Sequence, residues 1–249
     1  MLEVWLYTII SVFIVSLISL IGILTLSIKV EKLKTFLIYM VAFSAGALFG
    51  DAFLHLLPEI VEEHGFSLTV SGFILGGIAI FFTMEKLVHW QHCHHPITED
   101  HVHPFAIMNL VGDGVHNFID GLIIGVSYIV SIPVGIATTI AVALHEIPQE
   151  IGDFGILIHG GFSKGKALGL NFLTALAAII GAVIALTAQS YIENIELFII
   201  PIAVGGFIYI AGSDLIPELH KEFTVKKSIL QLIAFIAGIL VMAALLLLE

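Results

Sequence analysis

Apolar stretches of membrane-spanning length follow one another along almost the whole chain, separated by short polar breaks. A helix needs about 20 predominantly apolar residues to cross a bilayer. Eight stretches reach this length and leave no room for a soluble domain, so we predict a single transmembrane domain over 1–249. The predicted helices cover 3–28, 35–58, 67–90, 104–128, 132–160, 164–188, 195–219 and 226–248.

Composition agrees with a membrane protein. Of the 249 residues, 59% are hydrophobic and 12% are charged, and the charged share is about half that of an average soluble domain. The first stretch has neither a basic leader nor an A-x-A-like cleavage site, so we expect a retained helix and not a signal peptide. A single cysteine, Cys93, excludes an intrachain disulfide framework.

The lysines predict an orientation. Basic residues collect in short cytoplasmic loops, and with eight helices all nine lysines fall on one side, while the other side carries glutamates and no basic residue. We therefore predict that both termini lie outside and that the protein lies in the plasma membrane; we expect no nucleic-acid partner. The lysines are Lys29, Lys32, Lys34, Lys86, Lys164, Lys166, Lys221, Lys226 and Lys227, and the opposing glutamates are Glu3, Glu59, Glu62, Glu63, Glu193, Glu196 and Glu249.

Two passages resemble each other. Residues 46–59 run G-A-L-F-G-D-A-F-L-H-L-L-P-E, and residues 205–218 run G-G-F-I-Y-I-A-G-S-D-L-I-P-E. They lie on predicted helices 2 and 7, which cross the membrane in opposite directions, as in the inverted repeats of secondary transporters. We predict an all-α integral membrane fold in which helices 1–3 and 6–8 repeat around a central helix 4–5 pair. The alternative is that a P-E helix end has recurred by chance.

The longest polar break, 89–104, is rich in histidine and lies on the lysine side, which we expect to be cytoplasmic. Short tracts of this kind often bind metal, since imidazole and thiolate are zinc ligands. The spacing matches no closed tetrahedral site, so a regulatory metal-binding loop and a merely solvated loop both remain open. The candidate residues are His92, Cys93, His94, His95, His101 and His103.

Predicted helices 4 and 5 carry ionisable side chains that could bind a metal ion. Residues 112–121 run G-D-G-V-H-N-F-I-D-G, and residues 145–153 run H-E-I-P-Q-E-I-G-D. An ionised group at the bilayer centre costs about 2.5–3.5 kcal/mol, so five carboxylates facing lipid would cost about 15 kcal/mol. They must face one another, water or a cation. The five are Asp113, Asp120, Glu146, Glu150 and Asp153.

Spacing shows how these side chains combine. Residues four apart share a helix face, and two such faces turned toward each other would enclose a cage of nitrogen and oxygen ligands. The alternative is a hydrogen-bond network that only holds the helices together. The pairs are His116 with Asp120, beside Asn117; His145 with Gln149; and Glu146 with Glu150.

Pro148 lies inside helix 5, where it lacks an amide donor and frees the carbonyl of Leu144 as a further oxygen ligand. A mixed imidazole, carboxylate and amide set suits a borderline divalent ion. We expect Zn2+ as the bound or transported ion, with Fe2+, Mn2+ and Cd2+ open, and no separate cofactor.

Other polar residues in the spans have two interpretations each. Asn171 on helix 6 is a further ligand or a helix–helix hydrogen bond. The remaining candidates line a route for the ion into or out of the site, or cap and pair helices: Asp51, His55, Asp113, Asp153, Asp214 and Glu218.

The motifs of helices 4 and 5 resemble those of the ZIP (Zrt- and Irt-like) family of metal-ion transporters. The resemblance covers the full chain, including the His-rich loop after helix 3 and G-D-x-x-x-H-L-x-P on helix 2. It implies import of zinc or a related ion by an elevator-type carrier, commonly a homodimer, and no enzymatic activity. It implies one metal position at His116, Asp120, His145 and Gln149, and a neighbouring one at Asn117, Glu146 and Asn171 with shared carboxylates.

Position 149 departs from the family pattern. The most similar branch has H-E-x-P-H-E on helix 5, and Gln149 stands where that branch has the second histidine. A neutral amide weakens one metal position and leaves the metal preference open. The same change argues against an intramembrane zinc hydrolase, the alternative function, because the zincin motif H-E-x-x-H needs that histidine.

Overall fold

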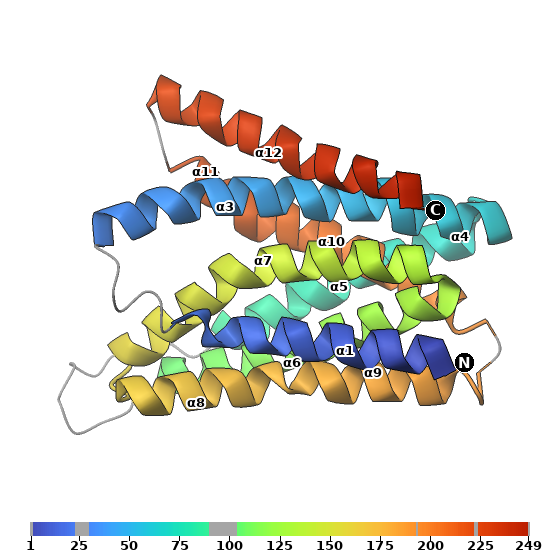
Figure 1. The fold of residues 1–249 in the computed structure, drawn as a ribbon, viewed down its shortest axis with the longest axis horizontal. Coiled ribbons are helices and arrows are strands. Elements are labelled where there is room, and N and C mark those ends of the chain that lie inside the picture. The colour runs from blue at the N-terminus through green and yellow to red at the C-terminus, as the bar shows by residue number, and fades with distance from the viewer. Residues whose placement is uncertain (1, 23–29, 90–103, 193, 222–223, 249) are drawn as a thin grey trace.

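The computed structural model describes residues 2–22, 30–89, 104–192, 194–221 and 224–248, and within them the chain forms eight helical rods (Figure 1). This confirms the eight predicted helices; the candidate residues of the His-rich loop lie outside the described ranges. The rods are α1 (Leu2–Ile18) with η1 (Ser19–Ile21); α3 (Val30–Gly50) with the π-helical turn η2 (Asp51–Leu56) and α4 (Leu57–His64); α5 (Leu68–His89); α6 (Pro104–Val130); α7 (Ile132–His159); α8 (Lys164–Ala175) with α9 (Ala177–Ala188); α10 (Glu196–Tyr209) with the π-helical turn η3 (Ile210–Leu215) and α11 (Ile216–Leu219); and α12 (Val225–Leu245) with η4 (Leu246–Leu248).

Six of the rods are long and apolar enough to cross a membrane. The other two, α6 and α7, have 27 and 28 residues, which at 1.5 Å per residue is about 40 Å and sufficient to span a bilayer. They carry five of the six buried carboxylates of the described residues and pack against α1, α3, α5, α8, α9 and α10. The protein is therefore an all-helical integral membrane protein in which the other helices shield the two that carry most of the buried carboxylates.

Three helix pairs cross with their backbones in contact at glycines. A Cβ atom on any of these glycines would lie 1.9–2.2 Å from a carbonyl oxygen of the partner helix, so no side chain fits there. Small residues allow membrane helices to approach this closely. The crossings are α3 with α12 at Gly46 and Gly238, α5 with α10 at Gly77 and Gly205, and α6 with α9 at Gly121 and Gly181.

The two similar passages also share a backbone feature. In each passage the sixth to eleventh residues form a π-helical turn, η2 in 46–59 and η3 in 205–218. A proline follows each turn, in the first turn of the next helix, where it is well tolerated. Helices α3 and α10 run in opposite directions (Figure 1). π-Helix makes up well under 1% of residues in proteins. Its occurrence at the same positions of both passages is therefore a structural similarity in addition to the shared sequence motif.

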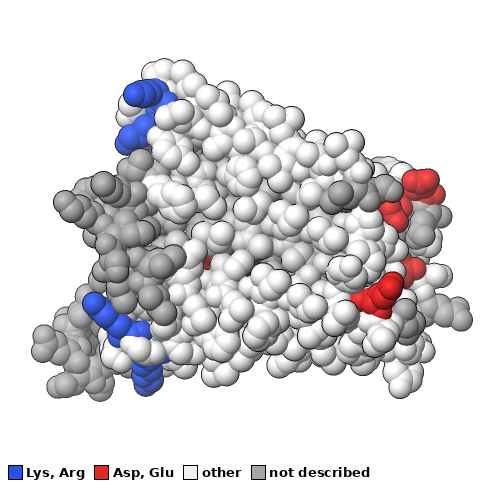
Figure 2. Space-filling model, viewed as in Figure 1, with Lys and Arg blue, Asp and Glu red and all other residues white. Residues whose placement is uncertain are grey.

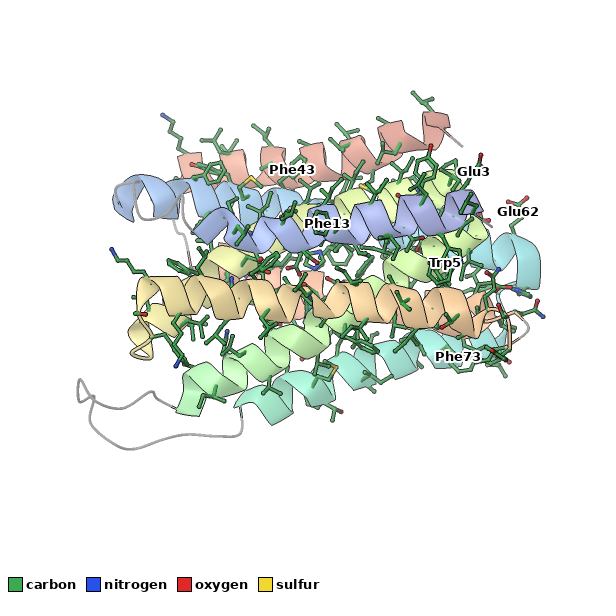
Figure 3. The ribbon with its side chains drawn as sticks, turned by 60° about the horizontal axis from the view of Figure 1, so that its bottom comes forward. Glu3, Trp5, Phe13, Phe43, Glu62 and Phe73 are labelled. Atoms are coloured by element: carbon green, nitrogen blue, oxygen red, sulfur yellow. The ribbon has the colours of Figure 1, made fainter. Side chains whose placement is uncertain are left out.

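Charged side chains gather at the two ends of the bundle. In Figure 2 the lysines lie at one end and the acidic residues at the other, with an almost uncharged band between them. Figure 3 places Glu3 and Glu62 together at the end where Figure 1 shows both termini. An uncharged band flanked by charged ends is the distribution expected of a protein that crosses a bilayer.

Candidate metal centre

Two imidazoles and two carboxylates meet between α6 and α7. His116 and Asp120 stand one turn apart on α6, and the consecutive residues His145 and Glu146 face them from α7. One ligand atom from each residue lies within 4.8 Å of all the others. Asp120, His145 and Glu146 are at most 1% exposed, whereas the His116 side chain is 14% exposed. We call these four side chains the N/O cluster.

The donor atoms of the N/O cluster have the spacing of a zinc site. His145 Nε2 lies 3.2 Å from His116 Nε2, 3.3 Å from Asp120 Oδ2 and 3.6 Å from Glu146 Oε1. His116 Nε2 lies 3.6 Å from the same two carboxylate oxygens. In tetrahedral zinc sites the ligands stand about 2.0–2.1 Å from the metal, which puts neighbouring donor atoms about 3.4 Å apart. The measured separations bracket that value.

The hydrogen bonds of the N/O cluster also fit a metal ion. His145 Nδ1 lies 3.2 Å from the Ala141 carbonyl oxygen; a proton on Nδ1 satisfies that carbonyl and leaves Nε2 with a free lone pair. All four carboxylate oxygens of Asp120 and Glu146 are buried without a hydrogen-bond donor among the described residues. Two neutral imidazoles and two such carboxylates carry a net charge that one divalent cation balances.

Pro148, inside α7, leaves the carbonyl of Leu144 to find a hydrogen-bond donor on another helix. Because Pro148 has no amide hydrogen, the Leu144 carbonyl loses its partner within the helix. The hydroxyl of Ser44 on α3 donates to that carbonyl oxygen at 2.6 Å. The oxygen that the sequence offered as a potential metal ligand thus accepts a hydrogen bond from another helix.

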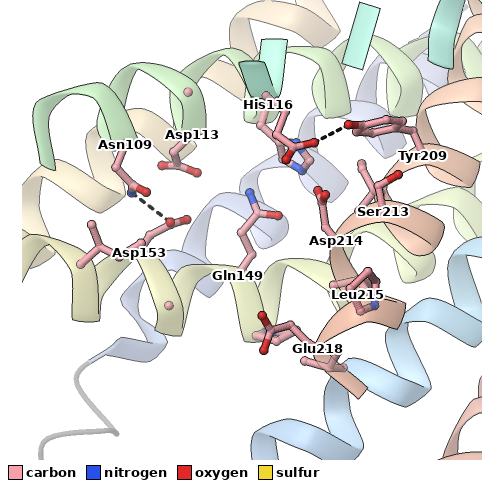
Figure 4. A pocket seen from close by; sticks show the side chains of 18 of the residues that line it. Asn109, Asp113, His116, Gln149, Asp153, Tyr209, Ser213, Asp214, Leu215 and Glu218 are labelled. Carbon is pink, nitrogen blue, oxygen red and sulfur yellow. Dashed lines mark hydrogen bonds between the residues drawn. The ribbon is translucent and has the colours of Figure 1, made fainter. Parts of the chain in front are cut away.

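A cavity of about 870 Å³ leads from the N/O cluster toward the lysine-bearing end. His116 lines it, and so does Lys221 near that end. Gln149, predicted to share a metal position with His145, points into the cavity (Figure 4). Glu146, predicted for the neighbouring metal position, lies with His116, Asp120 and His145 in the N/O cluster.

The other predicted residues separate into two sets. Asp214 and Glu218 line the cavity. Asp51 and His55 do not: the hydroxyl of Thr138 donates to Asp51 Oδ1 at 3.5 Å, and His55 Nε2 lies 2.9 Å from the Met242 carbonyl oxygen. Both are buried in helix packing.

A second acidic group lies further along α6 and α7. It consists of Asp113, Glu150 and Asp153. Two amides predicted as ligands donate to it: Asn117 Nδ2 bonds Asp113 Oδ1 at 2.9 Å, and Asn171 Nδ2 bonds Glu150 Oε2. We call Asp113, Glu150 and Asp153 the carboxylate cluster.

Several residues of the site escaped the sequence analysis. Asn109 Nδ2 donates to Asp153 Oδ1 at 2.9 Å, and the Thr174 hydroxyl donates to Asp113 Oδ2 at 2.5 Å. Asn109 stands four residues before Asp113, so the same-face rule could have found it. Glu85, which accepts a hydrogen bond from Tyr209 at the cavity wall, gave no comparable signal.

Eight membrane helices around a buried set of nitrogen and oxygen donors define an integral membrane protein with a candidate intramembrane metal site. Sequence comparison identifies the family. The profile of the ZIP zinc transporter family matches residues 2–106 and 91–246, together nearly the whole chain. The chain belongs to this family, whose members are transporters, so the hydrolase alternative does not hold.

Named relatives agree with the family assignment. The chain is 33% identical to zinc transporter zipt-7.2 of Caenorhabditis elegans, over 82% of this chain and 56% of that protein. It is 33% identical to zinc transporter ZIP13 of Danio rerio (86% and 76% covered) and 27% identical to zinc transporter SLC39A7 of Canis lupus familiaris (84% and 63% covered). The chain thus spans little more than half the length of the first of these relatives.

Proposed function

We propose that the protein carries zinc, or a related divalent ion, across the membrane toward its lysine-bearing side. The observation that carries the proposal is the N/O cluster, whose donor spacing of 3.2–3.6 Å matches a tetrahedral zinc site. The names of the relatives, which are zinc transporters, support the choice of ion.

The direction of transport follows from the cavity and the charges. The cavity extends from His116 to the end marked by Lys221, and lysine-rich ends face the cytoplasm. An ion leaving the N/O cluster through this cavity would therefore enter the cytoplasm. With this orientation both termini lie on the outer face. The plasma membrane as the location and the homodimer remain predictions.

The matched π-helical turns support the inverted repeat. Under this proposal helices 1–3 and 6–8 form two halves of opposite direction, and α6 and α7 lie between them. Inverted-repeat transporters bind their substrate near the bilayer midplane, where the halves meet. The N/O cluster lies near the middle of α6 and α7, in agreement with that plan.

Zinc flux into proteoliposomes tests the function. We expect protein-dependent uptake, reduced about tenfold or more by Asp120→Asn, because that change removes one of four ligands and a charge from the site. Glu62→Gln is the control, since it removes a carboxylate at the exposed acidic end and should leave flux unchanged. Absence of protein-dependent flux of zinc, iron, manganese or cadmium in either orientation would refute the proposal.

A further inference from the structure

Two phenylalanine rings flank the imidazoles of the N/O cluster. Phe81 on α5 lies against His116, with ring centroids 6.2 Å apart and ring planes at 88°. Phe207 on α10 lies against His145, at 6.3 Å and 63°, and the two imidazoles are 5.5 Å apart at 83°. Aromatic rings attract each other in such edge-to-face arrangements at centroid distances of about 4.5–7 Å. Successive contacts thus link four rings from four helices, and we call Phe81 and Phe207 the flanking rings.

The backbone contact between α5 and α10 holds the flanking rings. This crossing lies at Gly77 and Gly205, and Phe81 follows Gly77 by four residues while Phe207 follows Gly205 by two. The Phe81 ring packs on Gly206, where a Cβ atom would lie 2.4 Å from Phe81 Cε2. Phe81 and Phe207 are 5% and 0% exposed. The flanking rings are therefore fixed relative to each other by one close helix pair.

The two imidazoles differ in their hydrogen bonds. Histidines that bind a metal usually donate their second ring N–H to a carbonyl, a carboxylate or water, which fixes the orientation of the ring. His145 has such a partner, since its Nδ1 lies 3.2 Å from the Ala141 carbonyl oxygen. His116 interacts through Nε2, and its Nδ1 forms no hydrogen bond with any of the described residues. Within this part of the chain, ring packing against Phe81 and His145 fixes the plane of the His116 imidazole.

His116 is also the member of the N/O cluster that borders the cavity. Its side chain is 14% exposed, whereas Asp120, His145 and Glu146 are at most 1% exposed and do not line the cavity. Phe81 lines the cavity together with His116. An imidazole with one open side has room to rotate, so the ring packed against it determines whether Nε2 stays with the other three donors.

We propose that Phe81 is a positioning residue that holds the His116 imidazole in the orientation required for tetrahedral metal binding. The inference rests on the proposed function, because it takes the N/O cluster as the zinc site. Zinc prefers imidazole more than manganese does, so Phe81 favours zinc. Because Phe81 stands on α5 and His116 on α6, the zinc site is complete only while these helices are packed together. Phe207 has a smaller role, since the Ala141 carbonyl already orients His145.

The absorption spectrum of Co2+ bound to the purified full-length chain tests the proposal. The histidines within 92–103 are first replaced by asparagine and Cys93 by serine, so that loop ligands do not contribute. Four-coordinate Co2+ absorbs visible light much more strongly than six-coordinate Co2+. We expect the intense four-coordinate spectrum in this background and a weak spectrum in Phe81→Leu, because water replaces the misplaced imidazole. Zinc affinity should fall by at least about threefold in Phe81→Leu, and by less in Phe207→Leu.

Phe73→Leu is the matched control. Phe73 meets Phe198 edge to face between the same two helices, with centroids 5.2 Å apart at 85°, and it stands eight residues before Phe81, about 12 Å away along α5. It should keep the four-coordinate spectrum and change zinc affinity by less than about threefold.

Phe81→Met, a second apolar variant without a ring, should behave as Phe81→Leu does. The positioning role is refuted if both variants keep the wild-type spectrum and zinc affinity, or if Phe73→Leu has an equal effect, since packing of α5 on α10 would then explain the result. Zinc flux by the wild type decides the proposed function separately. Flux together with an unchanged spectrum in the Phe81 variants refutes only this inference, and the expected spectra without flux refute only the transport.

Discussion

The hydrogen bond between Ser44 and the Leu144 carbonyl gives the most specific prediction about stability. Pro148 takes away the amide that would normally serve this carbonyl, and Ser44 on α3 supplies a hydroxyl in its place. Ser44→Ala removes this donor, which also lies 2.8 Å from the Met40 carbonyl oxygen one turn earlier on α3. We therefore expect the part-buried Leu144 carbonyl to lose its hydrogen bond from α3.

The unfolding free energy lost in Ser44→Ala depends on which other hydrogen-bond donors the Leu144 carbonyl can reach. Hydrogen bonds between membrane helices contribute on average about 0.6 and at most about 1.7 kcal/mol. Because Pro148 offers this carbonyl no amide, we expect a cost near the upper value, about 1.5 kcal/mol. In a Pro148→Ala background residue 148 regains its amide and can bond the carbonyl, and Ser44→Ala should then cost about 0.6 kcal/mol. The two substitutions should couple by about 1 kcal/mol.

A double-mutant cycle in detergent measures this coupling. Unfolding free energies of the wild type, Ser44→Ala, Pro148→Ala and the double variant are compared under reversible conditions. Ser71→Ala is the matched control, because within the described part of the chain its hydroxyl donates to the Ser67 carbonyl, four residues earlier, at an exposed site. It should cost less than about 0.5 kcal/mol. If Ser44→Ala costs the same with and without Pro148, within about 0.3 kcal/mol, the proline does not create the need for this hydroxyl.

Three further predictions concern selectivity, packing and orientation. Gln149→His places an imidazole in the cavity beside the N/O cluster and should raise the preference for zinc over manganese about tenfold in competitive uptake; an unchanged ratio would contradict this. Gly121→Val forces a side chain to within 1.9 Å of the Ala178 carbonyl oxygen and should cost more than about 2 kcal/mol of unfolding free energy, whereas Gly76→Ala, with open space around it, should not destabilise. A membrane-impermeant maleimide should label Cys93 only from the cytoplasmic side. Labelling from the outer side would contradict the predicted orientation of the helices.

The sequence predicts the helices well because the bilayer imposes strict demands. Each span needs about 20 apolar residues, and the polar breaks are sharp, so α5 (Leu68–His89) and α7 (Ile132–His159) lie within about three residues of the predicted ranges. The pairing of His116 with Asp120 is equally local, since it follows from the helical period alone. Features set by one helix in isolation can therefore be obtained from the order of its residues.

What depends on how two helices face each other could not be predicted in this way. The spacing on α7 paired Glu146 with Glu150, yet in the structure Glu146 lies with His145 in the N/O cluster and Glu150 lies in the carboxylate cluster. The rotation of α7 against α6 decides which of these residues faces the site, and that rotation depends on packing across the bundle. The contribution of Thr174 from α8 was missed for the same reason, since a hydroxyl three residues after Asn171 carries no signal of its partner.

The glycine crossings also determine which parts of the molecule can shift against each other. Where two backbones touch, no side chain is available to deform, so we expect α6 and α9 to move as one rigid body, as we expect of α3 with α12 and of α5 with α10. The contact of α3 with α7 includes the single side chain of Ser44, whose hydrogen bond can break and form again. The cavity is lined by α3, α5 and the rod of α10, η3 and α11, and by α6 and α7. Under the proposed function, the ion would therefore pass between helices that belong to different rigid pairs.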